Sequence, residues 1–121
     1  MKQPKLKPKN MSTNDLTNAI RGELQFHGFP SWRINVQGQY DDKLGIWRKS
    51  GSTRGVFDIH TILFGRAVWI DCKNGNDTPS DEQLLFQQQV EQAGGIAIFV
   101  KDLISFRGWF LSYLRKEGRD A

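Results

Sequence analysis

Two aspartates and one lysine occur at the ends of two short apolar segments. Asp58 follows Gly55-Val-Phe, and Asp71 follows Ala67-Val-Trp-Ile, with Lys73 two residues further on. An acid within an apolar strand is unfavourable unless it is paired or binds a metal. Two carboxylates and a lysine are the groups that a Mg²⁺-dependent phosphodiesterase site requires, because Mg²⁺ prefers carboxylate, water and phosphate oxygens. The alternative is a structural ion pair between the lysine and one aspartate at a sheet end.

Strand geometry predicts that these three charged groups converge. Residues 56–63 and 67–73 have the apolar, β-branched and aromatic composition of strands. Because successive strand side chains point to opposite faces, Asp71 and Lys73 should project from the same face. If the two strands form a hairpin, the Asp58 carboxylate comes to lie beside them.

The rest of the hydrophobic pattern predicts an α/β domain with a central mixed sheet flanked by helices. We expect the order helix, three strands, helix, strand, helix (αβββαβα). The expected helices are 14–27, 81–93 and one that begins after an Asp102 N-cap; the expected further strands are 32–40 and 96–100, with a long polar loop at 41–55.

The net charge of +4 comes from the N-terminal segment. The sequence has 17 basic and 13 acidic residues, and residues 1–10 contain four lysines and no acid. The other 13 basic residues are balanced by the 13 acidic ones, so the high pI does not by itself indicate a nucleic-acid-binding body. We predict that residues 1–11 form a basic flexible tail and that residues 12–121 form one folded domain.

Composition argues against several classes of protein. No apolar run approaches about 20 residues, the length that crosses a bilayer, and no apolar segment follows the basic N-terminus as a secretory signal would require. The single cysteine, Cys72, cannot form an internal disulfide, and no Cys/His spacing suits zinc. We expect a cytoplasmic protein without membrane contact and without an organic cofactor.

Four short motifs follow one another along the chain. They are Gly55-Val-Phe-Asp58, Asp71-Cys72-Lys73, Ser80-Asp-Glu-Gln83, and Gly94-Gly95 before an apolar strand. Together with Arg33-Ile34-Asn35, this order resembles the VRR-NUC family, a branch of the PD-(D/E)XK nucleases, over residues 12–106. The resemblance implies a restriction-endonuclease-like core, Mg²⁺ or Mn²⁺, and hydrolysis of DNA. Small members of that family resemble Holliday-junction resolvases, act as homodimers, and often belong to bacterial viruses (phages).

The resemblance implies roles for residues of these motifs. Asp58 and Asp71 would bind the metal, with the Cys72 backbone carbonyl as a further candidate ligand. Lys73 would position the attacking water. Gln83 would orient water or phosphate, although its motif is equally a helix capping box.

The sequence departs from the family pattern at three positions. Phe57 replaces the usual proline, and Asp71 stands where the family usually has glutamate. The acid of the family's first helix falls near Asp15, with Glu23 as the alternative because both lie on one helical face. These departures motivate a second hypothesis, a catalytically silent DNA-binding module of the same fold.

Two residues beside the motifs have competing interpretations. His60 shares the strand face of Asp58 and could act as a base, but a strand histidine is more often a partly buried structural residue. The Cys72 side chain should point away from Asp71 and Lys73, so it is expected to be a small core residue.

A basic segment precedes the strand of Asp58. Residues 43–54 contain four basic residues, one tryptophan and no acid. Such a loop can contact phosphates and stack on an unpaired base, whereas the alternative is a solvated flexible loop. The candidate DNA-contacting residues are Arg33, Asn35, Lys43, Trp47, Arg48, Lys49 and Arg54. The sequence therefore predicts a homodimeric DNA endonuclease for branched DNA, such as Holliday junctions or flaps, in a bacterial or phage-infected cell.

Overall fold

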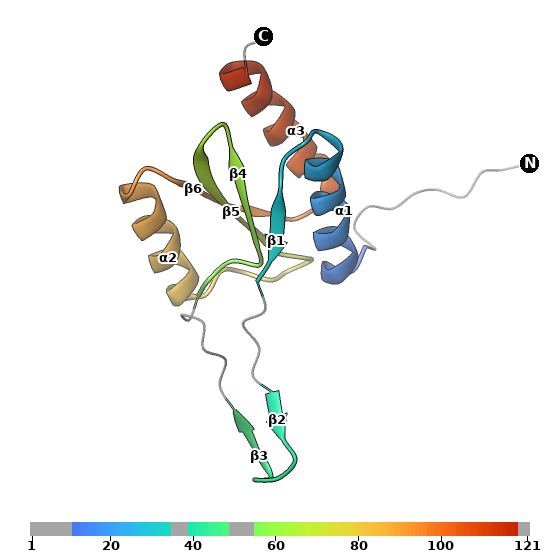
Figure 1. The fold of residues 1–121 in the computed structure, drawn as a ribbon, viewed down its shortest axis with the longest axis vertical. Helices are drawn as coiled ribbons and strands as arrows, with labels where there is room; N and C mark the ends of the chain where they lie inside the picture. Colours follow the sequence, from blue (N-terminus) through green and yellow to red (C-terminus); the bar gives the residue numbers. More distant parts are fainter. Residues whose placement is uncertain (1–10, 35–38, 49–54, 119–121) are drawn as a thin grey trace, which may run out of the picture.

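The structure, a computed structural model, describes residues 11–34, 39–48 and 55–118 (Figure 1). The elements in chain order are α1 (Thr13–Phe26), β1 (Ser31–Arg33), β2 (Gln39–Asp41), β3 (Ile46–Arg48), β4 (Ile59–Leu63), β5 (Arg66–Cys72), α2 (Asp81–Gln92), β6 (Ile96–Val100), α3 (Leu103–Tyr113) and the π-helical turn η2 (Leu114–Gly118). The predicted α/β architecture, a mixed sheet flanked by helices, is confirmed.

The main sheet has four strands in the order β1-β4-β5-β6. β4 pairs antiparallel with both β1 and β5, whereas β6 pairs parallel with β5. The parallel step requires a crossover, which α2 provides. In the β4–β5 ladder Ile59 pairs with Ile70, and the same register continued by one residue sets Asp58 opposite Asp71.

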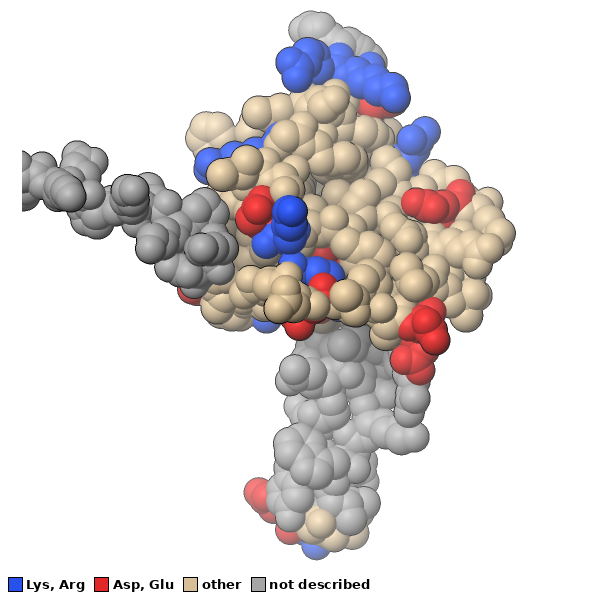
Figure 2. Space-filling model, turned by 180° about the vertical axis from the view of Figure 1, so that it is seen from behind, with Lys and Arg blue, Asp and Glu red and all other residues tan. Residues whose placement is uncertain are grey.

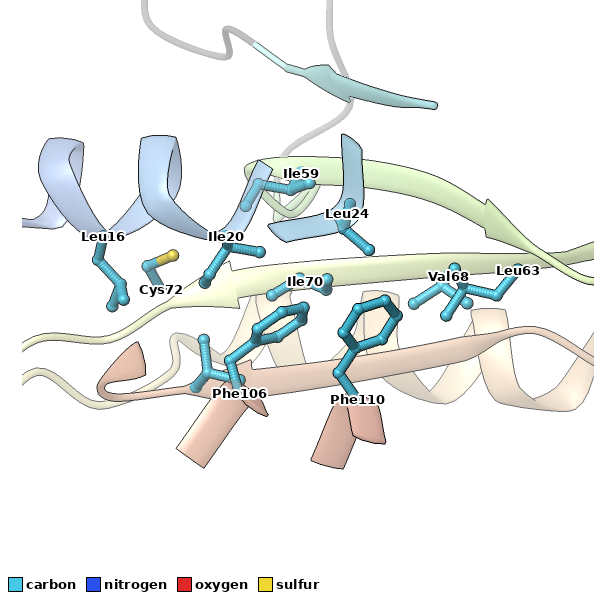
Figure 3. Packing of buried hydrophobic residues seen from close by; sticks show 11 residues of the cluster. Leu16, Ile20, Leu24, Ile59, Leu63, Val68, Ile70, Cys72, Phe106 and Phe110 are labelled. Atoms are coloured by element: carbon cyan, nitrogen blue, oxygen red, sulfur yellow. The ribbon is translucent and has the colours of Figure 1, made fainter. Parts of the chain in front are cut away.

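Helices α1 and α3 cover one face of the sheet (Figure 1). The apolar stripe of α1 consists of Leu16, Ile20 and Leu24, which are four residues apart and therefore share one helical face. Figure 3 shows these side chains meeting Phe106 and Phe110 of α3 over the middle of the sheet. This cluster is the hydrophobic core, and it holds the ends of β4 and β5 in place.

Helix α2 packs on the other face, beside β5 and β6 (Figure 1). Phe57 is fully buried here, with its ring 5.2 Å from that of Phe86 in α2 and 4.7 Å from that of Phe99 in β6. Phe57 therefore fills the layer between α2 and the sheet.

The prediction of a loop over residues 41–55 was wrong at residue 41 and at residues 46–48, which belong to strands. Gln39–Asp41 and Ile46–Arg48 form the antiparallel hairpin β2–β3, with Tyr40 opposite Trp47. A four-residue turn joins them, and its last residue, Gly45, has a φ of 67° that suits glycine. The expected strand at 32–40 is also interrupted, because β1 ends at Arg33. The predicted element order omitted this hairpin.

Met11, which the sequence assigned to the basic tail, belongs to the folded part of the protein. Its side chain packs against the core, and its carbonyl accepts a hydrogen bond of 2.9 Å from Asn74 Nδ2. This contact ties the start of α1 to the segment that follows β5. No helix in the described part of the chain is long and apolar enough to cross a membrane.

Candidate active site

Asp71 is a buried carboxylate at the end of β5, with 2% of its surface exposed. Its Oδ1 atom accepts a hydrogen bond of 3.3 Å from the Asp58 backbone N–H. Its Oδ2 atom accepts one of 3.2 Å from Gln83 Nε2 and lies 3.0 Å from Lys73 Nζ. These three donors compensate the loss of water around the carboxylate, which explains how an acid can occupy this position.

Asp58 lies next to Asp71 but in a less compensated environment. The pKa of Asp58 is raised from 3.8 to about 6, chiefly by partial burial and next by the negative charge of Asp71. The Cys72 backbone N–H donates to the Asp58 carboxylate and, together with the Lys73 charge, opposes this shift. The two carboxylates therefore repel each other, and one lysine does not compensate both.

The first turn of α2 completes this cluster through Gln83. Ser80 Oγ accepts from the Gln83 backbone N–H, and Gln83 Oε1 accepts from the Ser80 N–H, each at 3.1 Å. The other end of the same amide donates to Asp71. Gln83 therefore closes the predicted capping box and also holds a site carboxylate, while its contact with water or phosphate stays a prediction.

The structure brings together Asp58, Asp71, Lys73 and Gln83, the four residues that the sequence assigned to catalysis. The ion pair between Lys73 and Asp71 shows that their side chains project to the same side. Lys73 keeps 20% of its side chain exposed, so its ammonium group can also be reached from solvent. Their roles remain predictions.

Neither candidate for the first-helix acid joins this cluster. Glu23 Oε2 accepts hydrogen bonds from Arg107 of α3, the shorter at 2.7 Å. Asp15 is exposed in the first turn of α1, where its backbone N–H donates to the Ser12 N-cap. Among residues 11–34, 39–48 and 55–118, no group of three or more His, Cys, Asp and Glu side chains could hold a metal ion.

The donor set nevertheless fits a Mg²⁺ or Mn²⁺ ion. Mg²⁺ is usually held by one or two carboxylates, with water and substrate phosphate as the other ligands. Asp58 and Asp71 supply two carboxylates whose mutual repulsion a cation would relieve. The Cys72 carbonyl remains a predicted further ligand.

The Cys72 side chain belongs to the core, on the opposite face of β5. The thiol is buried and accepts a hydrogen bond of 3.5 Å from Thr17 Oγ1 of α1. Burial raises its pKa from 9.0 to about 11, so it stays protonated and unreactive at neutral pH.

The predicted DNA-contacting residues are distributed over β1 and the hairpin. Arg33 is exposed at the end of β1, where its guanidinium donates to Asn14 Oδ1. Lys43 is exposed in the hairpin turn, and Trp47 and Arg48 belong to β3. The hairpin extends from the end of the sheet at which α2 begins (Figure 1). Asn35, Lys49 and Arg54 lie outside the described residues.

Charge is unevenly distributed over the rest of the surface. Figure 2 shows acidic side chains over α2 and basic side chains at the end of the chain. Helix α2 carries Asp81, Glu82 and Glu91 and no basic residue, whereas η2 carries Arg115 and Lys116. The outer surface of α2 is therefore unfavourable for a phosphate backbone.

A row of aromatic rings next to the carboxylates was not predicted as a unit. The His60 ring stacks on Trp69 with centroids 4.2 Å apart, and the Trp32 ring lies 5.7 Å away on its other side. Strand alternation places His60 and Trp69 on the site face. Trp32 is added by the β1–β4 register, in which it pairs with His60.

The sequence matches no protein-family model, and no curated protein is significantly similar to it. The chemical interpretation of the site therefore depends on its residues and their geometry.

Proposed function

We propose that the chain is a divalent-metal-dependent DNA endonuclease, a VRR-NUC-like member of the restriction-endonuclease-like class. The observation that carries this proposal is the crowding of Asp58 against Asp71 beside Lys73. A structural ion pair would need only one acid for one lysine. Here partial burial and then the charge of Asp71 raise the pKa of Asp58 although Lys73 is nearby, and a bound cation would favour the ionised form of both carboxylates.

The residues of the site suit hydrolysis of a phosphodiester. Asp58 and Asp71 would hold Mg²⁺ or Mn²⁺, which when bound polarises the phosphoryl group and lowers the pKa of a coordinated water. The partly exposed Lys73 ammonium donates hydrogen bonds to the attacking water or to phosphoryl oxygens, where negative charge accumulates. Gln83 keeps Asp71 oriented. Water adds to phosphorus and one P–O ester bond breaks, which leaves a phosphate monoester and a hydroxyl group.

DNA as the substrate, its branched form and a homodimeric assembly come from the family resemblance. The position of the β2–β3 hairpin supports a nucleic-acid substrate, because Lys43, Trp47 and Arg48 belong to an element that extends from the end of the sheet where α2 begins. The acidic surface of α2 favours an approach of DNA from the side of β1 and the hairpin.

A catalytically silent DNA-binding module is the second candidate. The observation that favours it is the Glu23–Arg107 pair, which engages one of the two candidates for the first-helix acid. This candidate predicts salt-sensitive DNA binding without a metal-dependent product.

Cleavage of labelled linear, flap and four-way-junction DNA tests the proposal in Mg²⁺, Mn²⁺ and EDTA. Asp58→Asn and Lys73→Ala should each lower the cleavage rate by about 100-fold or more. Glu91→Gln is the matched control, because it removes one negative charge from the exposed end of α2 and should cleave normally. DNA binding without product in any metal would favour the silent module, and unchanged cleavage by Lys73→Ala would remove the lysine from the mechanism.

A further inference from the structure

The sheet face that carries Asp58 and Asp71 is only partly covered by α2. Phe86 of α2 meets the Trp69 ring edge-on, with centroids 5.1 Å apart, and so closes the β5 side. On the β1 and β4 side, Trp32 is 46% exposed and Ile62 is 40% exposed. The open part of this face thus presents a tryptophan directly beside the candidate active site.

The exposed tryptophan is the outer end of an ordered row of rings. The Trp69 and His60 rings stack with an interplanar angle of 21°, whereas the His60 and Trp32 rings are tilted by 31° with centroids 5.7 Å apart. A hydrogen bond of 3.1 Å joins His60 Nδ1 to the Val68 carbonyl, which fixes the middle ring. A further flat ring placed on Trp32 would continue the row.

The row of rings lies two residues along strands β4 and β5 from the two carboxylates. His60 is two residues beyond Asp58, and Trp69 is two residues before Asp71, in paired strands. Two residues of a strand span about 7 Å. A nucleotide whose phosphate lies at the carboxylates can therefore bring a neighbouring base to the ring row.

We propose that Trp32 is a stacking platform for an unpaired DNA base next to the scissile phosphate. The inference rests on the proposed function and names the feature of the substrate that the site selects. Base pairs inside a duplex are stacked on both sides and offer no free face, whereas an unpaired base does.

Fluorescence anisotropy with the full-length protein in EDTA tests this without catalysis. The probes are a labelled single-stranded oligonucleotide and a duplex of the same sequence. Trp32→Ala should weaken single-strand binding by about tenfold, because it removes the ring on which a base would stack. Duplex binding should change little, and Trp32→Phe should restore most of the loss. Ile62→Ala is the matched control, since it truncates an exposed apolar side chain on the same face without removing a ring.

Oligonucleotides with a single abasic position provide the second measurement. One such position should weaken binding by the wild-type protein and not weaken binding by Trp32→Ala any further. The platform would be overturned if the abasic position weakened binding equally for the wild type and for Trp32→Ala. It would also be overturned if Trp32→Ala lost affinity equally for the single strand and for the duplex. A dimer that Trp32→Ala dissociates, with unchanged affinity for DNA, would also overturn it and assign the surface to a second copy of the chain.

The same variants separate this inference from the proposed function. If the wild-type protein cleaves DNA, Asp58→Asn does not, and Trp32→Ala behaves as wild type in every assay, the platform fails and the nuclease stands. If single-strand binding depends on Trp32 but no metal yields a product, the platform stands and hydrolysis fails.

Discussion

At the residue scale, Asp58 and Asp71 show how two identical side chains acquire different properties. Asp71 is almost fully buried and bonded by three donors, whereas Asp58 is half-buried and faces the charge of its neighbour. Gln83 donates to Asp71 through Nε2 and accepts from the Ser80 N–H through Oε1. It is therefore a positioning residue of the candidate site.

The raised pKa of Asp58 makes a prediction about stability and pH. Because its folded-state pKa of about 6 exceeds the ordinary value of 3.8, its stabilising contribution is complete below pH 3.8 and is lost as the pH rises through about 6. Asp58→Asn removes this pH-dependent loss of stability, because an asparagine side chain does not ionise. After allowance for solvent screening, the metal-free variant should gain about 1 kcal/mol at neutral pH, or about 3–5 °C in Tm.

Thermal unfolding in EDTA on both sides of this pH window measures the effect. The Tm difference between Asp58→Asn and wild type should be larger above pH 6 than near pH 3.8. Adding Mg²⁺ at neutral pH should raise the Tm of the wild type more than that of the variant, because only the wild type keeps both carboxylates. A difference in Tm that does not change with pH would show that Asp58 does not titrate in this window.

At the element scale, the turn before β4 and the start of α2 fix each other. Gly55 has a φ of +84°, and a Cβ atom on it would lie 2.4 Å from the Glu82 carbonyl oxygen of α2. Because the carbonyl belongs to a helix, it cannot move aside as a flexible side chain would. This contact sets the distance between the strand of Asp58 and the helix of Gln83.

Gly55→Ala should therefore destabilise the protein by about 2 kcal/mol or more and lower the cleavage rate. Gly28→Ala is the matched control, because Gly28 has a φ of +87° but a Cβ atom on it would meet no other atom within 4 Å. It should cost only the backbone strain, about 1 kcal/mol, and leave cleavage unchanged. Denaturant unfolding and the cleavage assay measure both variants, and equal losses of stability would show that the contact with α2 is unimportant.

The elements also show which features can be predicted from a sequence. Helices α1 and α2 and strand β6 were predicted within one or two residues, because their caps and apolar periods are local signals. The convergence of Asp58 with Asp71 followed from alternation in two strands joined by a short turn. The position of Trp32 beside His60 depends on pairing between strands 28 residues apart, which no local pattern specifies. The same is true of the Glu23–Arg107 pair, which joins two helices distant in the sequence.

At the scale of the whole molecule, charge is divided between a neutral body and a basic N-terminal segment. All of the net charge of +4 comes from the four lysines of residues 1–10. If this segment strengthens DNA binding, it acts through long-range attraction and counterion release, and not through the geometry of the site. The alternative is that the segment is a solvated end without a role in binding.

A chain that begins at Met11 separates these two possibilities. If the lysines contact phosphates, the slope of log affinity against log salt should fall by up to about 3–4 for duplex DNA, when measured between about 50 and 200 mM salt. Cleavage at saturating DNA should persist, because Asp58, Asp71 and Lys73 lie elsewhere in the chain. A full-length variant with the four lysines replaced by glutamine is the control for length, and it should reproduce the lower slope. An unchanged slope in both proteins would show that the neutral body supplies all the phosphate contacts, and would direct attention to Arg33 and the β2–β3 hairpin.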